Sequence, residues 1–325
     1  MISPYCPSLI SRSAKLCSAL HTLPVAFESL TTSLGNLLSQ ALPEAPPLIY
    51  GEPDTQSSDV GLYGPGSMTW RVHSHPVAAI AGVRALMMQA LHPVAMRGVA
   101  AHSAYKTDPW GRLARTAEFV SVASFATTDE AIRAGLKVQE VHQRLGVDAP
   151  DLLRWVHIAF VNSLLEVYLL VEELSETEKD AYVFEQRKFA SLVGLNESEV
   201  PHTYEQMNLY LETMKPMLYA SSEARDAVRF IVAPPMSTEV KMLTPAVPLW
   251  FGLAATAFAT LPRWARVEFG DGAVGLALAG LPLIDTIQTK IIANSWAAAL
   301  SNLPEELRKN PWMKACETRL GQTIS

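Results

Sequence analysis

Apolar residues recur along most of this chain at intervals of three and four positions, the spacing that places them on one face of an α-helix. No run alternates apolar and polar residues as a half-buried strand does. We therefore expect an all-α fold. The pattern predicts helices within 8–41 and at 76–91, 93–104, 110–124, 129–145, 150–174, 176–193, 203–219, 221–231, 248–260, 263–269 and 273–300.

Capping residues mark where several of these helices begin. Thr127 or Thr128 stands before two acids, which are favourable in the first turn of a helix. Pro150 suits a first-turn position, because its missing N–H has no partner there in any helix. Ser175 and Glu178 have the spacing of a capping box. These signals fix the starts of three of the predicted helices.

Two segments separate the beginning of the chain from its long helices. The proline-rich stretch 43–53 ends the first helices, and a polar, glycine-containing loop follows at 54–67. Residues 232–248 form a proline-containing connection, after which the last helices suggest a C-terminal helical hairpin. The expected organisation is an N-terminal helical extension over 1–47 and a single helical domain over 48–325.

Composition narrows the class of protein. The 325 residues are 49% hydrophobic and 18% charged, with a net charge of −6 and no basic tract, so we expect no nucleic-acid partner. The cysteines (Cys6, Cys17 and Cys316) form no CxxC pair, which argues against a disulfide framework or a zinc site. The first residues lack the long apolar core of a secretory signal. A cytoplasmic protein is expected.

One apolar stretch raises the question of membrane contact. Residues 245–262 carry no charge over about 18 positions, the lower limit for a helix that spans a bilayer. Prolines interrupt the stretch, and Arg263 and Arg266 follow it directly. A buried core helix is the first interpretation. Peripheral contact with the membrane interface is the second, and a true span is the third.

Potentially functional side chains are most concentrated between residues 84 and 116. Arg112, Arg115 and Thr116 are spaced i, i+3 and i+4, so they share one helical face. Two guanidinium groups on one face can bind carboxylates in a bidentate manner, as an anionic cofactor would require. The alternative is a solvated face whose arginines pair with acids. Arg84 interrupts an apolar helix and needs a counter-charge, either a ligand carboxylate or an acid such as Glu118.

Two histidines lie on apolar stripes of successive predicted helices. His142 has Val138, Val141 and Leu145 at helical spacing, and His157 lies among leucine, valine and phenylalanine residues. A buried imidazole needs a partner, and a backbone carbonyl is the commoner one. Two such residues near an arginine face favour a metal ligand together with a supporting residue. Motifs for nucleotide binding, serine hydrolysis and zinc proteolysis are missing from the sequence, and a carboxylate di-iron site is disfavoured.

Seven segments of the chain form a specific set, although each is weak alone. They are PPLIYGEP, GLYGPGSMTWRVHSHP, GVRALMMQALHPVAMRGVAAHS, DPWGRLARTAEFV, VHQRLG, DLLRWVHIAFVNS and LPRWAR. In these segments residues 48–270 resemble the MpaB oxygenase family, whose domain is shared with the latex-clearing proteins, or rubber oxygenases. Intracellular members are the most similar type.

The resemblance implies an all-α domain with a globin-like core that binds haem b. It places the axial iron ligand on His142 and a further motif histidine on His157. It sets Arg112, Arg115 and Thr116 beside the haem, the last two in catalytic roles, and Arg84 is expected to contact a propionate. Characterised members cleave carbon–carbon double bonds of isoprenoids with dioxygen.

Two departures from the family pattern affect the expected chemistry. Latex-clearing proteins carry lysine where this chain has Arg115, and close relatives have a longer loop at 146–150. A guanidinium has no lone pair, so Arg115 cannot close the distal side of the iron. We expect an oxygenase with an open distal site that acts on a small apolar substrate with dioxygen or peroxide. The alternatives are a haem-binding sensor or carrier without turnover, and a membrane-apposed helical protein.

Overall fold

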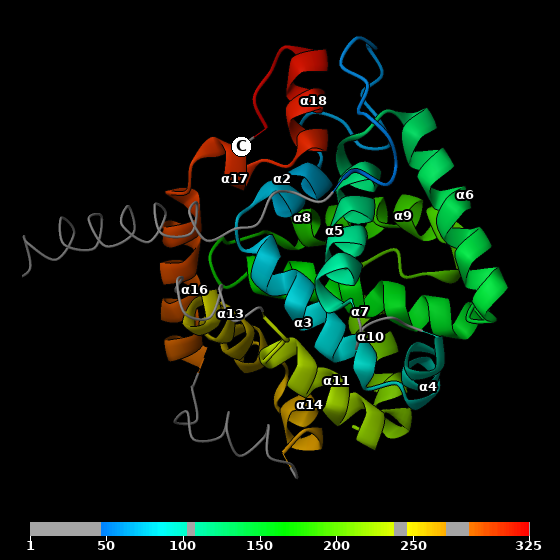
Figure 1. The fold of residues 1–325 in the computed structure, drawn as a ribbon, viewed down its shortest axis with the longest axis vertical. Coiled ribbons are helices and arrows are strands. Elements are labelled where there is room, and N and C mark those ends of the chain that lie inside the picture. The colour runs from blue at the N-terminus through cyan, green and yellow to red at the C-terminus, as the bar shows by residue number, and fades with distance from the viewer. Residues whose placement is uncertain (1–46, 103–107, 237–245, 271–285, 325) are drawn as a thin grey trace, which may run out of the picture.

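The structure is a computed structural model that describes residues 47–102, 108–236, 246–270 and 286–324. Every regular element in these ranges is helical, which confirms the expected all-α class (Figure 1). In chain order the elements are α2 (Met68–Ser74), α3 (Ala78–Ala90), α4 (Pro93–His102), α5 (Pro109–Phe125), α6 (Thr128–Leu145), α7 (Pro150–Tyr168), α8 (Glu176–Glu185), α9 (Arg187–Leu192), the 3-10 turn η2 (Glu197–Glu199), α10 (Tyr204–Met214), the 3-10 turn η3 (Lys215–Met217), α11 (Ser222–Val232), α13 (Ala246–Ala259), α14 (Arg263–Glu268), α16 (Thr286–Ser301), α17 (Glu305–Arg308) and α18 (Pro311–Leu320).

Most predicted helices are present, and the differences have local causes. The cap at Thr127, the capping box at Ser175 and the first-turn Pro150 are confirmed, and Thr127 also forms a capping box with Glu130. The predicted helix 203–219 ends early because Pro216 falls in the 3-10 turn that follows α10. The predicted helix 176–193 is two helices, α8 and α9, which meet at the buried Gln186.

Three short helices, α2, α17 and α18, were not expected from the pattern. Helices of four to ten residues show too few turns for a clear periodicity. The helices predicted within 8–41, and the first part of the one predicted at 273–300, lie outside the described residues. The first half of the expected C-terminal hairpin is α13, and α16 packs against it.

The core is formed largely by α7 lying against α3. Met87 of α3 and Leu91, which caps that helix, are fully buried, as are Trp155 and Leu165 of α7. Two side chains also cross the contact: the indole N–H of Trp155 donates to the Gln89 carbonyl at 3.2 Å, and the Gln89 amide donates to the Val156 carbonyl at 3.0 Å. Each large apolar side chain buried here contributes about 1.5–3 kcal/mol, so the two helices are fixed firmly relative to each other.

The apolar stretch 245–262 corresponds mainly to α13, which packs against α3, α11 and α16. Ala254 and Ala257 are fully buried, whereas Val247 and Phe251 at its start are exposed. This agrees with the first interpretation, a core helix. Within the described ranges no individual helix is both long enough and apolar enough to cross a bilayer; α3 with the first part of α4, bent by 106°, meets that test only as a pair.

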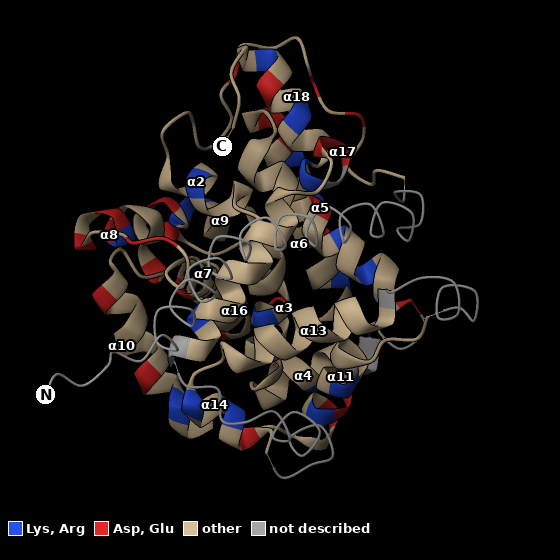
Figure 2. Cartoon of the chain, turned by 90° about the vertical axis from the view of Figure 1, so that its left-hand side faces the viewer, with Lys and Arg blue, Asp and Glu red and all other residues tan. Residues whose placement is uncertain are grey.

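Charged side chains of both signs are distributed over the surface. Acidic groups gather on α8, and basic groups gather on α14 (Figure 2). Most ion pairs among the described residues join neighbours one helical turn apart, such as Arg229 with Asp226. Exposed pairs of this kind contribute little to stability. The fold therefore depends on apolar packing and on a few buried polar contacts.

The C-terminal helix α18 holds the loop 54–67 against α5. Arg319 donates three hydrogen bonds to backbone carbonyls, at 2.8 Å to Asp59, 3.2 Å to Asp54 and 3.0 Å to Phe125. In Figure 1 this helix lies beside the loop that leads into α2. One side chain therefore joins three segments that are distant in the sequence.

Replacing Arg319 with alanine should lower the free energy of unfolding by about 2–4 kcal/mol, because three carbonyls lose a charged donor. Chemical denaturation followed by circular dichroism measures this change. The control is Arg144→Ala, because Arg144 is exposed and pairs only with Glu140 on its own helix at 3.5 Å. Equal stability of the two variants would contradict the assigned role of Arg319.

Candidate functional site

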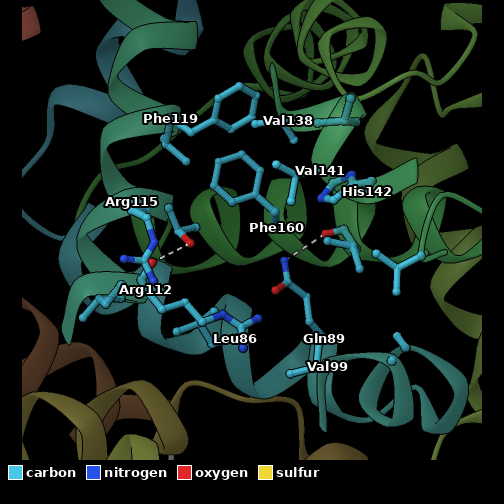
Figure 3. A pocket seen from close by; sticks show the side chains of 18 of the residues that line it. Leu86, Gln89, Val99, Arg112, Arg115, Phe119, Val138, Val141, His142 and Phe160 are labelled. Carbon is cyan, nitrogen blue, oxygen red and sulfur yellow. Dashed lines mark hydrogen bonds between the residues drawn. The ribbon is translucent and has the colours of Figure 1, made fainter. Parts of the chain in front are cut away.

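A cavity of about 720 Å³ lies between α3, α4, α5, α6 and α7. This volume is within the range of small-molecule and cofactor sites. Most of its wall is aliphatic or aromatic, and part of it is shown in Figure 3. The apolar lining includes Leu86, Met96, Val99, Leu113, Phe119, Val138, Val141, Phe160, Phe189 and Phe230.

The predicted histidine stripe of α6 faces this cavity. Val138, Val141, His142 and Leu145 all line it, as their i, i+3, i+4 and i+7 spacing requires. On α7 the cavity is lined by Leu153, Val156, His157 and Phe160, which have the same spacing. The opposite stripe of α7 is the one that packs on α3. The two histidines predicted from separate helices therefore meet at one site.

Both imidazoles are held neutral by burial. Desolvation lowers the pKa of His157 to about 3 and also lowers the pKa of His142. The Nδ1 atom of each ring is buried and has no hydrogen-bond partner among the described residues. His157 also stacks on Phe189, with ring centroids 6.0 Å apart. A neutral imidazole keeps one nitrogen lone pair, so each ring is in the state that binds a metal ion.

The predicted Arg112–Arg115–Thr116 face forms another part of the lining. Arg115 donates to Asp108 at 3.0 Å, which lowers the pKa of that carboxyl group, and its side chain is 47% exposed. The Thr116 hydroxyl donates to the Arg112 carbonyl of the preceding turn at 3.0 Å. The arginine face is therefore at the mouth of the cavity, where it is accessible to both solvent and a ligand.

The charged side chains among the described residues that line the cavity are all positive. Among the described lining residues the charged side chains are Arg112, Arg115 and Lys137, and none is acidic. Figure 3 shows Arg112 and Arg115 on one side of the cavity and His142 on the other, with Phe160 between them. The site thus offers two guanidinium groups at one side, the His142 imidazole at the other, and apolar surface in the middle. This arrangement suits a flat, mostly apolar anion.

Two rim segments complete the cavity, and sequence reasoning assigned no role to either. Ile49 and Tyr50 line it and are held by Glu118, whose carboxylate accepts from their backbone amides at 2.8 and 3.1 Å. On another part of the rim, Trp110 donates from its indole to the Pro235 carbonyl at 3.0 Å and packs edge-on against Trp250. The signals were an aromatic residue in a loop, Tyr50, and tryptophans near the starts of α5 and α13, which rarely indicate a site by themselves.

Arg84 is not among the residues that line the cavity. It is buried and donates to the Thr260 carbonyl at 3.2 Å, to Asn162 at 3.0 Å and to Ser163 at 2.7 Å. Burial lowers its pKa to about 10, so it remains charged at neutral pH. Of the two expected counter-charges, the Glu118 carboxylate binds the amides of residues 49 and 50 and not Arg84. The hydrogen bonds of Arg84 go to neutral groups of α7 and to the Thr260 carbonyl just after α13, and the Glu166 carboxylate attracts its charge.

These features define a helical domain built around a ligand-sized, cation-edged apolar cavity. Residues 70–276 match the family model described as ER-bound oxygenase mpaB/B'/Rubber oxygenase, catalytic domain. The match covers more than half of the chain, so this protein belongs to that family and carries an oxygenase-type catalytic domain. Comparison with curated proteins and with solved structures found no match. The family resemblance expected from the sequence motifs is confirmed.

The neutral state of His157 makes stability depend on pH. Its pKa is depressed in the folded protein, so between about pH 3 and pH 6.5 the unfolded chain binds more protons and stability falls as pH falls. Wild type should lose about 1.4 kcal/mol per pH unit relative to His157→Phe below pH 6.5, with no further change above pH 7. Denaturation midpoints measured from pH 4.5 to pH 8 test this. Parallel curves for the two proteins would contradict it.

Proposed function

We propose that this protein is a haem b-dependent oxygenase that acts on a small apolar substrate with dioxygen or peroxide, and that His142 is the axial ligand of the iron. The oxygenase class follows from the family. The observation that carries the haem assignment is a pair of neutral imidazoles in an apolar cavity whose charged lining residues, among those described, are cations.

The residues present fit haem b. A porphyrin brings four equatorial nitrogens and needs only one or two axial ligands from the protein, and a histidine is a common one. Its faces are apolar like the cavity wall, and its two propionates match the guanidinium groups of Arg112 and Arg115. We assign Nε2 of His142 as the coordinating atom, because Nδ1 of this ring is enclosed by protein atoms. His157, on the adjacent helix, is the supporting residue.

Bound haem would supply the activation of dioxygen or peroxide, and the chain's own residues would control access and orientation. Arg115 has only donors, so it can hydrogen-bond to a propionate or to the oxidant but cannot ligate iron. Thr116 has used its proton on the Arg112 carbonyl, so its oxygen is left as an acceptor. The aromatic and aliphatic wall around Phe160 and Val99 excludes water and favours an apolar substrate.

Titration with haemin tests the ligand assignment. Wild type should bind one haemin per chain with a Soret band of histidine-ligated iron, and His142→Ala should lose that band because no other side chain is assigned to the axial position. His157→Ala is the matched control, since it removes the other imidazole of the wall. Retention of the band in His142→Ala with its loss in His157→Ala would move the ligand to His157.

A measurement of dioxygen uptake then distinguishes catalytic turnover from haem binding without turnover. Haemin-loaded protein should consume dioxygen or peroxide when a small alkene is added, and an oxygenated product should form. Stable haem binding without uptake across a series of alkenes would favour a sensor or carrier over an oxygenase.

The arginine face should contribute directly to haem affinity. Arg112→Ala and Arg115→Ala should each weaken binding about ten- to a hundredfold, because a propionate loses a charge-assisted hydrogen bond worth about 1–3 kcal/mol. Arg144→Ala is the control, because Arg144 lies on α6 outside the cavity lining. Unchanged affinity in both cavity variants would identify a solvated helix face and leave the propionates without a protein partner.

A further inference from the structure

A buried polar cluster joins α2, α5 and α8 and has no role in the proposed haem site. His73 lies at its centre, with Nδ1 at 2.7 Å from the Ser124 hydroxyl and Nε2 at 3.0 Å from the Tyr182 hydroxyl. Tyr182 is fully buried and His73 is 9% exposed. No local pattern in the sequence indicates the cluster, because α2 is only seven residues long and the partners of His73 are 51 and 109 positions away.

The hydrogen bonds determine which ring nitrogen of His73 carries the proton. Ser124 donates its only proton to the Val120 carbonyl at 2.7 Å, so its oxygen must accept from Nδ1–H of His73. Nε2 is then unprotonated and accepts from the Tyr182 hydroxyl. Burial lowers the pKa of His73 to about 3 and keeps the ring neutral. The Tyr182 phenol is therefore paired with a base at a distance suited to proton transfer.

A series of ring contacts connects this pair to the cavity. The Phe160 ring lines the cavity and lies edge-on to His73, with centroids 5.8 Å apart. On its other side Phe160 stacks on Phe189 at 5.1 Å, and Phe189 stacks on His157 at 6.0 Å. Rings in contact provide short steps for electron transfer through a protein interior. Tyr182 thus lies at the end of a continuous aromatic path that begins at the cavity wall.

We propose that Tyr182 and His73 form a redox pair that gives one electron to an oxidised metalloporphyrin in the cavity. The phenolic O–H bond breaks, its electron reduces the oxidised centre by one equivalent, and its proton moves along the hydrogen bond to Nε2. The products are a neutral phenoxyl radical and an imidazolium, and reduction of the radical reverses both transfers. The pair would reduce the oxidised metalloporphyrin when no substrate is there to react with it. This inference rests on the proposed haem function.

Two other tyrosines with hydrogen-bonded hydroxyls, Tyr168 and Tyr204, differ from Tyr182. The Tyr168 hydroxyl accepts from the Arg71 guanidinium at 2.9 Å, so it has a cation beside it. Tyr204 donates to Glu166 at 2.7 Å, but the Lys179 ammonium lies 5.3 Å above its ring and opposes removal of an electron. Oxidation should therefore localise on the phenol that is bonded to His73.

Electron paramagnetic resonance of the haemin-loaded full-length protein, frozen shortly after addition of hydrogen peroxide, tests the proposal. Wild type should give a tyrosyl radical signal that narrows when the protein contains ring-deuterated tyrosine. The signal should be lost in Tyr182→Phe and retained in Tyr168→Phe, a variant that also removes one phenol from a buried ring. A polar cluster with only a structural role would give the same signal in both variants.

A second readout needs no substitution, in case a variant does not fold. In wild type exchanged into D₂O, the radical should show coupling to a single exchangeable deuteron, the one transferred to His73. A radical without this coupling, or a signal that persists in Tyr182→Phe, overturns the redox pair while leaving the haem site intact. Failure of haemin to bind, seen as the lack of a Soret band before peroxide is added, overturns the proposed function and this inference with it.

Discussion

The contact of α7 with α3 is the interaction on which the rest of the molecule depends. One stripe of α7, including Trp155 and Leu165, is buried against α3, and this fixes the rotation of the helix about its axis. The opposite stripe, with His157 and Phe160, must then face the cavity. Loosening this contact would move an imidazole, an aromatic wall residue and the start of the path to His73 together. The packing that forms the core therefore also positions the residues of the site.

Electrostatics determines the charge state of the polar groups in the cavity and where the charged ones lie. Water is largely excluded from an apolar wall, so the two imidazoles stay neutral and keep a lone pair each, and the guanidinium groups remain at the mouth where solvent reaches them. Arg84 is a buried cation outside the cavity: it donates hydrogen bonds to neutral acceptors, and the Glu166 carboxylate attracts its charge. Its charge is thus separated from the cavity, and the cations available to a ligand are those on α5 and α6.

Local periodicity predicted much of the fold and part of the candidate site. The stripe that contains His142 and the face that contains Arg112 and Arg115 both line the cavity, because helical spacing alone decides which side chains share a face. Contacts between distant segments could not be predicted in this way. The partners of Arg84 lie 78 and 79 residues away, and the loop residues at 49 and 50 reach the site through a carboxylate on α5. No local pattern in a single sequence encodes such pairings.

The central claim is that the cavity holds iron on His142. Anomalous scattering at the iron absorption edge, from crystals of the protein grown with haemin, locates the metal without reference to spectra or activity. An iron peak is expected inside the cavity, at coordination distance from Nε2 of His142. An iron peak elsewhere, or a cavity without iron in crystals that contain it, would show that His142 is not the ligand.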